Sequence, residues 1–286
     1  MPRIINFYYL CTRKEGNVQK NTQSVKIKVI LEALEHFAPL PLQESWDNAG
    51  LQVGLTETDA SGALLCLDVN EDIVDEAIEK GCNLIVSHHP LLFRGLKQVS
   101  DANYVQRIVM KAVKNDIAII SMHTNMDNAK NGVNYKIAEK LGLTDVRFLD
   151  TKQGVTPECG SGVIGEFASG MDAEAFIMKV KETFGCGCVM TNEPLQRAIK
   201  RVAICGGAGA FLLDEAVKAN ADAFITGEMH YHEYFDHEQE IQIAVIGHYE
   251  SEHFTTEIFR DIIADACPCL RTEIATTNTN PIRYYS

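Results

Sequence analysis

The sequence has little positive charge and no long apolar run. Its 286 residues hold 26 Lys and Arg against 39 Asp and Glu, a formal net charge of -13. Nucleic-acid backbones are bound by clustered Lys and Arg, so this balance argues against a nucleic acid as partner. No apolar run approaches the roughly 20 residues that cross a bilayer, so no membrane association is expected.

Paired cysteine motifs are also missing. None of the nine cysteines forms a CxxC pair, and Cys186-x-Cys188 and Cys267-Pro-Cys269 are too closely spaced for a zinc knuckle. Others, such as Cys66 and Cys205, stand in apolar segments, where cysteine behaves as a small hydrophobe. We therefore expect reduced thiols in a cytoplasmic protein.

The hydrophobic pattern that is present begins near residue 24 and predicts an α/β protein. Residues 1–23 are expected to be an extension of unclear role, because their basic residues follow the short apolar run, the reverse of a secretory signal. Helical spacing and buried-strand runs then alternate along the chain. We expect helices at 27–37, 71–80 and 104–115, and strands at 63–69, 83–87 and 117–122. This alternation predicts a mainly parallel sheet covered by helices.

The second half of the chain repeats this plan. Strands are expected at 201–205, 223–226 and 241–247, and helices at 211–219 and 252–265. The stretch 150–162 is rich in Gly, Thr and Pro and marks the expected boundary between a first lobe at 24–150 and a second at 151–286. Residues 74–77 match 213–216, and 119–123 match 244–248, so we infer an internal duplication in which Asp127 and Glu252 are equivalent.

Histidine and acidic residues gather where the predicted strands end. Seven of the nine histidines lie in or beside four such places: His88-His89, His123 with Asp127, Glu228 with His230 and His232, and His248 with Glu252. Ligands collect outside the carboxyl ends of strands in open α/β sheets. Imidazole and carboxylate together suit zinc, iron, manganese or nickel. The convergence of these residues at one edge predicts a metal site.

Each of these residues alone also has an ordinary structural explanation. Extended backbone would turn His88 and His89 to opposite sides, although Pro90 keeps His89 out of the α region. His248 and Glu252 stand at i and i+4, as ligands or as a surface pair on one helix face. Asp127 has the position of a helix N-cap.

Two further segments attract attention. Gly206-Gly207-Ala208-Gly209 stands between a predicted strand and a predicted helix. Backbone amides there can hold an anion, so Gly206, Gly207 and Gly209 are candidate substrate-binding residues, with a tight turn as the alternative. The segment 46–50, Trp-Asp-Asn-Ala-Gly, is typical of a turn that presents polar groups, although core packing would account for Trp46.

Together these segments resemble the Nif-three-like family, known in bacteria as GTP cyclohydrolase I type 2 homologues. The matching segments follow the family order: 45–54, 87–91, 123–127, 226–228 with His232, and 247–252. The resemblance implies two interlocked α/β lobes and a toroidal homohexamer. It also implies a dinuclear site with two divalent ions, iron or zinc, whose ligands would be His88, His89, Asp127, His248 and Glu252, with Glu252 as the bridge.

The same resemblance implies a function. His123, Glu228 and His232 would lie beside the metals as orienting or proton-transfer groups, and Glu228 stands where the family usually has aspartate. Two metals lower the pKa of a bound water, and a histidine can carry its proton near neutral pH. This fits hydrolytic opening of a purine ring, as in a GTP cyclohydrolase, and equally a phosphoesterase. A non-enzymatic metal-handling or regulatory scaffold is the alternative of another class.

Overall fold

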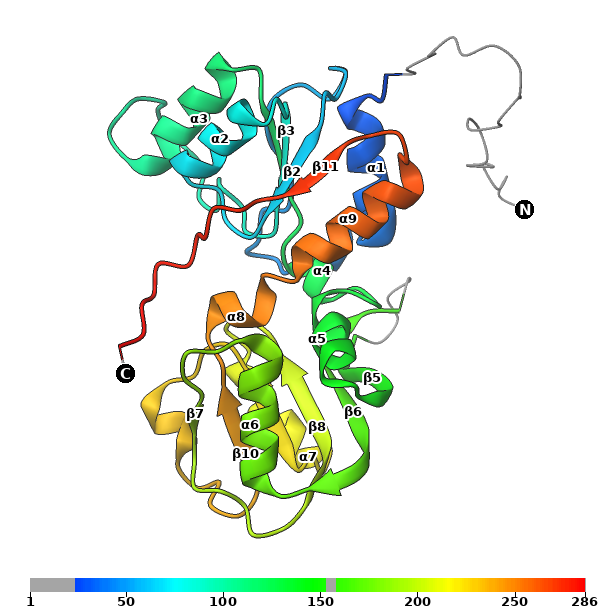
Figure 1. Cartoon of the computed structure of the whole chain (residues 1–286), viewed down its shortest axis with the longest axis vertical. Coiled ribbons are helices and arrows are strands. Elements are labelled where there is room, and N and C mark those ends of the chain that lie inside the picture. The colour runs from blue at the N-terminus through cyan, green and yellow to red at the C-terminus, as the bar shows by residue number, and fades with distance from the viewer. Residues whose placement is uncertain (1–23, 153–157, 286) are drawn as a thin grey trace, which may run out of the picture.

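The computed structural model describes residues 24–152 and 158–285, so the predicted extension at 1–23 lies outside the described residues. Figure 1 shows two lobes, one above the other, each built around one sheet. The order of strands in the first sheet is β1-β4-β3-β2-β11. Its strands are β1 (Gly50–Val53), β2 (Ala63–Cys66), β3 (Leu84–Ser87), β4 (Ala118–Ser121) and β11 (Thr272–Ile274). Only the β1–β4 pair is antiparallel among these described strands.

Helices cover both faces of the first sheet because its central strands are apolar on both faces. Every residue of β2, β3 and β4 is buried. Leu64 and Ile85 pack into one core with the helices α2 (Glu71–Glu79) and α3 (Tyr104–Lys114). Their neighbours Leu65 and Val86 pack into another core with α1 (Ile27–Phe37) and α9 (Thr255–Ala266). This alternation is the period of a strand that is buried on both sides.

The second sheet has the order β5-β6-β8-β9-β10-β7 and is mixed. Its strands are β5 (Thr144–Thr151), β6 (Gly160–Met171), β7 (Met190–Thr191), β8 (Ile199–Cys205), β9 (Ala223–Thr226) and β10 (Gln242–Val245). The strands β8, β9 and β10 are parallel, as predicted, and the other pairs are antiparallel. The pair β5–β6 was not predicted, because the four glycines of β6 weaken its strand pattern.

The remaining elements complete the second lobe and join it to the first. The α-helices are α4 (Thr124–Asp127), α5 (Val133–Leu141), α6 (Ala173–Phe184), α7 (Leu213–Lys218) and α8 (His248–Glu252). Short 3-10 helices are η1 (Leu40–Leu42), η2 (Ala210–Leu212) and η3 (Tyr231–Tyr234). The helix predicted at 252–265 is divided: α8 ends at Glu252, and α9 begins at Thr255. The hydroxyl of Thr255 donates to the Glu252 carbonyl at 2.7 Å and so competes with a continuous helix.

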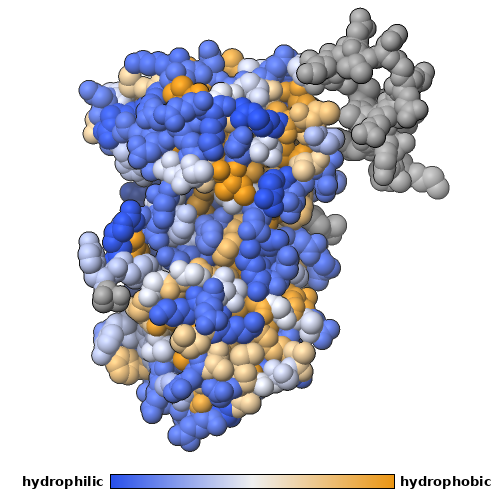
Figure 2. Space-filling view, viewed as in Figure 1, coloured by the Kyte–Doolittle hydropathy of each residue, from blue (hydrophilic) through white to orange (hydrophobic). Residues whose placement is uncertain are grey.

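The lobes interlock at the C-terminal end of the chain. After α8 the chain returns to the first lobe, where α9 packs against α1 and β11 pairs with β2. Residues 255–274 therefore pack with the first sheet, although the predicted lobe boundary at residue 150 assigns them to the second lobe. Figure 2 shows a largely hydrophilic face on the upper lobe and more apolar patches on the lower lobe. No described helix is long and apolar enough to span a membrane.

Candidate metal centre

The carboxyl ends of β3 and β4 bring three histidines to the boundary between the lobes. His88 and His89 follow β3, and both of their backbone amides donate to the Leu67 carbonyl, at 3.1 and 3.0 Å. His123 follows β4, and the centroid of its ring lies 5.2 Å from that of His88 and 5.5 Å from that of His89. The adjacent histidines do not diverge as extended residues would. Their Nε2 atoms lie 3.8 and 3.0 Å from one oxygen, Glu252 Oε2.

Helix α8 brings His248 and Glu252 to the same place from the second lobe. Glu252 Oε2 lies 3.0 Å from His248 Nε2, and His248 Nε2 lies 3.3 Å from His89 Nε2. Gly207 permits this approach, because a Cβ at that position would collide with Glu252 Oε1. Gly207 also has φ +59°, which glycine adopts without strain. Asp127 Oδ1 lies 3.6 Å from His88 Nε2, so all five predicted ligands lie in one cluster.

His88 has a buried ring nitrogen that the described residues leave without a hydrogen-bond partner. Its side chain is fully buried, and burial, opposed by Glu252, lowers its pKa to about 4, so it is neutral at pH 7. Nδ1 lies 2.8 Å from the Met122 carbonyl and must donate to it, which leaves a lone pair on Nε2. Nε2 has no hydrogen-bond partner among the described residues. It faces the carboxylates of Asp127, at 3.6 Å, and Glu252, at 3.8 Å, and these are acceptors too.

The two carboxylates of the cluster have opposite pKa shifts. Burial alone would raise the pKa of Glu252, but the imidazoles of His248, His88 and His89 hold it well below its usual range. Burial and the neighbouring charge of Glu252 raise the pKa of Asp127 well above its usual range. Two carboxylates this close are not both stable as anions unless positive charge is supplied. The lone pair of His88 Nε2, which no described donor satisfies, and the two carboxylates that it faces fit a bound cation.

A carboxylate orients each of the other three imidazoles. Nδ1 of His89 lies 2.7 Å from Asp68 Oδ1, and Nδ1 of His123 lies 2.7 Å from Asp47 Oδ1. Nδ1 of His248 lies 2.8 Å from Glu228 Oε1. Ligating histidines typically bond a carboxylate or carbonyl through the other ring nitrogen, which fixes the ring and the tautomer. Each bond here directs Nε2 away from the carboxylate that holds Nδ1.

The orienting carboxylates affect the charge of the site as well. Burial alone would lower the pKa of His89, but Asp68 and Glu252 outweigh it and raise the pKa to about 10. The same balance, with Glu252 as the main partner, raises the pKa of His248 to about 9. Burial would raise the pKa of Asp47, but its bonds from His123 and Thr124 lower it to about 2. Asp47 is therefore ionised at neutral pH.

Asp68 was missed by sequence reasoning, and Asp47 was placed only in a polar turn. Asp68 follows β2 by two residues, so it lies at the same sheet edge as the histidines, and this position is the signal that could have revealed it. The side chain of Thr279 donates to its second oxygen at 2.8 Å. Trp46 does not pack in the core: it is 58% exposed, and its ring centroid lies 6.0 Å from that of His123.

The remaining candidates have other surroundings. His232 is exposed on η3, where its ring contacts Tyr231 and Phe235, and its proton-transfer role stays a prediction. In the glycine segment, the amide of Gly206 donates to the side chain of Asn134. Those of Gly207 and Gly209 donate to the hydroxyls of Ser251 and Thr226. These three amides are engaged within the protein, and substrate binding by the glycines stays a prediction.

The ligand atoms form three groups that could each hold a metal ion, every atom within 4.8 Å of the others in its group. One contains His89, His248 and Glu252, and another contains His88, Asp127 and Glu252. The third contains His88, His89 and His123. The first two groups share Glu252, so this carboxylate lies between two potential ion positions.

Comparison with known proteins identifies the family. The family model described as Duf34/NIF3 (NGG1p interacting factor 3) matches residues 25–281. The chain belongs to this family. A Clostridium acetobutylicum relative named GTP cyclohydrolase 1 type 2 homolog is 34% identical over 82% of this chain and 86% of its own length. NIF3-like protein 1 of Drosophila melanogaster is 32% identical over 86% of this chain and 82% of its own length.

Solved structures of the family share the fold. That of Staphylococcus aureus protein SA1388 matches with a TM-score of 0.83 and 29% identity, over 91% of this chain and 99% of that chain. The two-lobed α/β fold of this chain is therefore shared with that solved structure.

Proposed function

We propose that this chain is a metal-dependent hydrolase that acts on a nucleotide, with two divalent cations, iron or zinc, held by His88, His89, Asp127, His248 and Glu252. The unpartnered, fully buried Nε2 of His88 carries this proposal. No donor among the described residues bonds it, and the carboxylates of Asp127 and Glu252 lie 3.6 and 3.8 Å away. A cation satisfies the lone pair and both acids at once. The position of Glu252 in two of the three ligand groups supports two ions with a shared carboxylate.

Divalent cations held there would lower the pKa of a bound water and polarise a substrate oxygen or ring carbon. The protein supplies the proton transfer. In the neutral tautomer that donates Nδ1–H to Asp47, Nε2 of His123 is an acceptor. It can take a proton from the attacking water, and Asp47 stabilises the imidazolium that results. His123 is 15% exposed, so the proton can return to solvent or to a leaving group.

The reaction we propose is hydrolytic opening of the purine ring of GTP, with release of formate. The names of the bacterial relatives support this substrate. The test is incubation of the iron- or zinc-loaded protein with GTP, followed by assays for formate and for phosphate. The proposal is supported if the wild type releases formate and His123→Asn releases it at least a hundredfold more slowly at unchanged metal content.

Four outcomes would overturn the proposal. Absence of formate with both metals excludes a cyclohydrolase, and phosphate without formate assigns a phosphoesterase instead. Wild-type turnover in His123→Asn removes the proton-transfer role of His123. Metal binding with release of neither formate nor phosphate favours a metal-handling scaffold. We also propose that the chain assembles as a toroidal homohexamer, as its family resemblance implies. Light scattering on the eluting protein should then give six times the mass of the chain.

A further inference from the structure

A cavity of about 680 Å³ opens beside the candidate metal centre. His248 and Glu228, which belong to that centre, form part of its wall. The rest of the wall comes from the second lobe and from the C-terminal segment that follows β11. Small-molecule sites in proteins typically have volumes of about 300–1,000 Å³, so the space suits a ligand of that size.

Apolar and aromatic side chains dominate this wall: Met190, Phe211, Met229, Val245, Ile282 and Tyr284. Several of them are unusually exposed for their type, with Phe211 68% and Met190 55% accessible. Exposed apolar side chains that converge beside a polar centre mark a binding site, because solvent contact with them is unfavourable. A flat ring that covers them would remove that contact and still leave its edge beside His248.

Apart from any metal ions, the charge of the wall disfavours phosphate as the group that fills it. No lysine or arginine is among the described residues that form it, whereas Glu228 and Glu233 are. Phosphate sites use Arg or Lys side chains or free backbone amides, and the amides of the adjacent glycine segment are already engaged.

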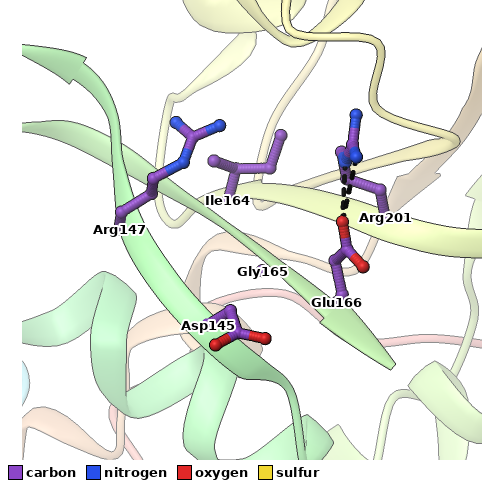
Figure 3. Close-up of a pocket in the computed structure, with 6 residues that line it drawn as sticks. All are labelled: Asp145, Arg147, Ile164, Gly165, Glu166 and Arg201. Carbon is purple, nitrogen blue, oxygen red and sulfur yellow. Dashed lines mark hydrogen bonds and ion pairs between the residues drawn. The ribbon is translucent and has the colours of Figure 1, made fainter. Parts of the chain in front are cut away.

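Arginines of the same lobe line a different space. A cavity of about 180 Å³ on β5, β6 and β8 is lined by Arg147 and Arg201, and Arg201 pairs with Glu166 at 3.0 Å. Figure 3 shows these two arginines on either side of Ile164. None of the residues that line this smaller cavity is a candidate metal ligand. These two arginine side chains therefore line the smaller cavity, and neither of them lines the cavity beside the metal centre.

We propose that the cavity beside His248 binds the uncharged heteroaromatic ring of the substrate, a purine base, and leaves the phosphate groups outside. Glu228 accepts a bond from His248 through Oε1, and a carboxylate has further lone pairs that can accept from ring N–H groups. The inference rests on the proposed function and adds which part of the nucleotide reaches the metals. A base in this position places ring carbons, rather than phosphorus, beside the centre.

Calorimetric titration of the full chain tests this placement without any need for turnover. The probes are guanosine, which has the base and no phosphate, and tripolyphosphate, which has phosphate and no base. We expect the chelator-treated protein to bind guanosine and to bind tripolyphosphate at least tenfold more weakly. Phe211→Ala should weaken guanosine binding about tenfold, because an aromatic stacking partner is lost. Met190→Arg should introduce tripolyphosphate binding.

Tyr104→Ala is the matched control, because Tyr104 is 59% exposed on α3 and forms no part of this wall. It should leave guanosine affinity unchanged. Tighter binding of tripolyphosphate than of guanosine by the chelated wild type would overturn the inference, as would equal guanosine affinity in Phe211→Ala and wild type. Formate release with that equal affinity refutes the inference alone. Guanosine binding that depends on Phe211, without formate release, refutes the proposed reaction alone.

Discussion

Replacement of Glu76 by glutamine tests how the C-terminal segment is anchored to the first lobe. Glu76 is 7% exposed on α2. Its Oε1 accepts bonds from the Thr276 amide and hydroxyl, at 2.7 and 2.9 Å, and its Oε2 accepts from the Thr277 amide at 2.9 Å. Burial alone would raise the pKa of Glu76. These donors, with Lys80 at 3.0 Å, outweigh burial and lower the pKa to about 2.

The pKa sets the magnitude and the pH window of the effect. A change from 4.5 to about 2 corresponds to roughly 3 kcal/mol of stabilisation by the ionised form. Because the folded-state pKa is depressed, this contribution is complete above pH 4.5 and is lost as the pH falls through 2. Glutamine removes the charge and turns its own NH2 group toward the N–H and O–H donors of Thr276 or Thr277. Glu76→Gln should therefore lower the free energy of unfolding by about 3 kcal/mol at pH 7.

Urea unfolding of wild type and variant, followed by circular dichroism between pH 7 and pH 2.5, measures this difference. It should stay near its full value down to pH 5 and shrink below it. Glu79→Gln provides the control, since Glu79 is exposed on the same helix. A difference under about 0.5 kcal/mol at pH 7, the scale of ordinary surface substitutions, would refute the reasoning. So would a difference that stays constant to pH 2.5.

Three further predictions concern the metal centre. Asp68→Asn should weaken zinc binding about 10- to 100-fold in competition with a chromophoric chelator, because His89 loses the carboxylate that orients it; unchanged affinity would contradict this. Gly207→Ala should abolish zinc binding, as measured by calorimetry, because the added Cβ collides with Glu252. Gly185→Ala is the control, since Gly185 has φ +61° but no atom lies within 4 Å of the added Cβ. It should lower the free energy of unfolding in urea by only about 1 kcal/mol, from backbone strain. Zinc at about 100 times its Kd should stabilise the chelated protein by about 2.7 kcal/mol, and a melting temperature that does not respond to zinc would exclude a folded-state site.

The parallel core of both sheets could be predicted because its strands are short, apolar and buried on both faces. The strand predicted at 223–226 matches β9 residue for residue, and the helix predicted at 27–37 matches α1. The strands that were missed have weaker patterns. In β1 only Gly50 and Val53 are buried, and β7 has just two residues, both exposed. Pairing with a neighbour, rather than their own composition, makes these segments strands.

The sequence by itself determined that His and acidic residues directly follow the buried strands of each half. Such residues lie at the carboxyl edge of their own sheet, whatever the details of packing. The choice of five ligands came from the family resemblance, and the equivalence of Asp127 and Glu252 in the matching halves stays a prediction.

Only the tertiary structure decided how those residues are held and what lies beside them. The orienting carboxylates Asp47 and Asp68 are 76 and 21 positions from the histidines they bond, and no local periodicity links such partners. The same is true of the cavity beside His248, whose wall joins side chains from distant segments. The meeting of the first-lobe histidines with His248 and Glu252 depends on how the two lobes pack, and the return of α9 and β11 to the first sheet joins the lobes.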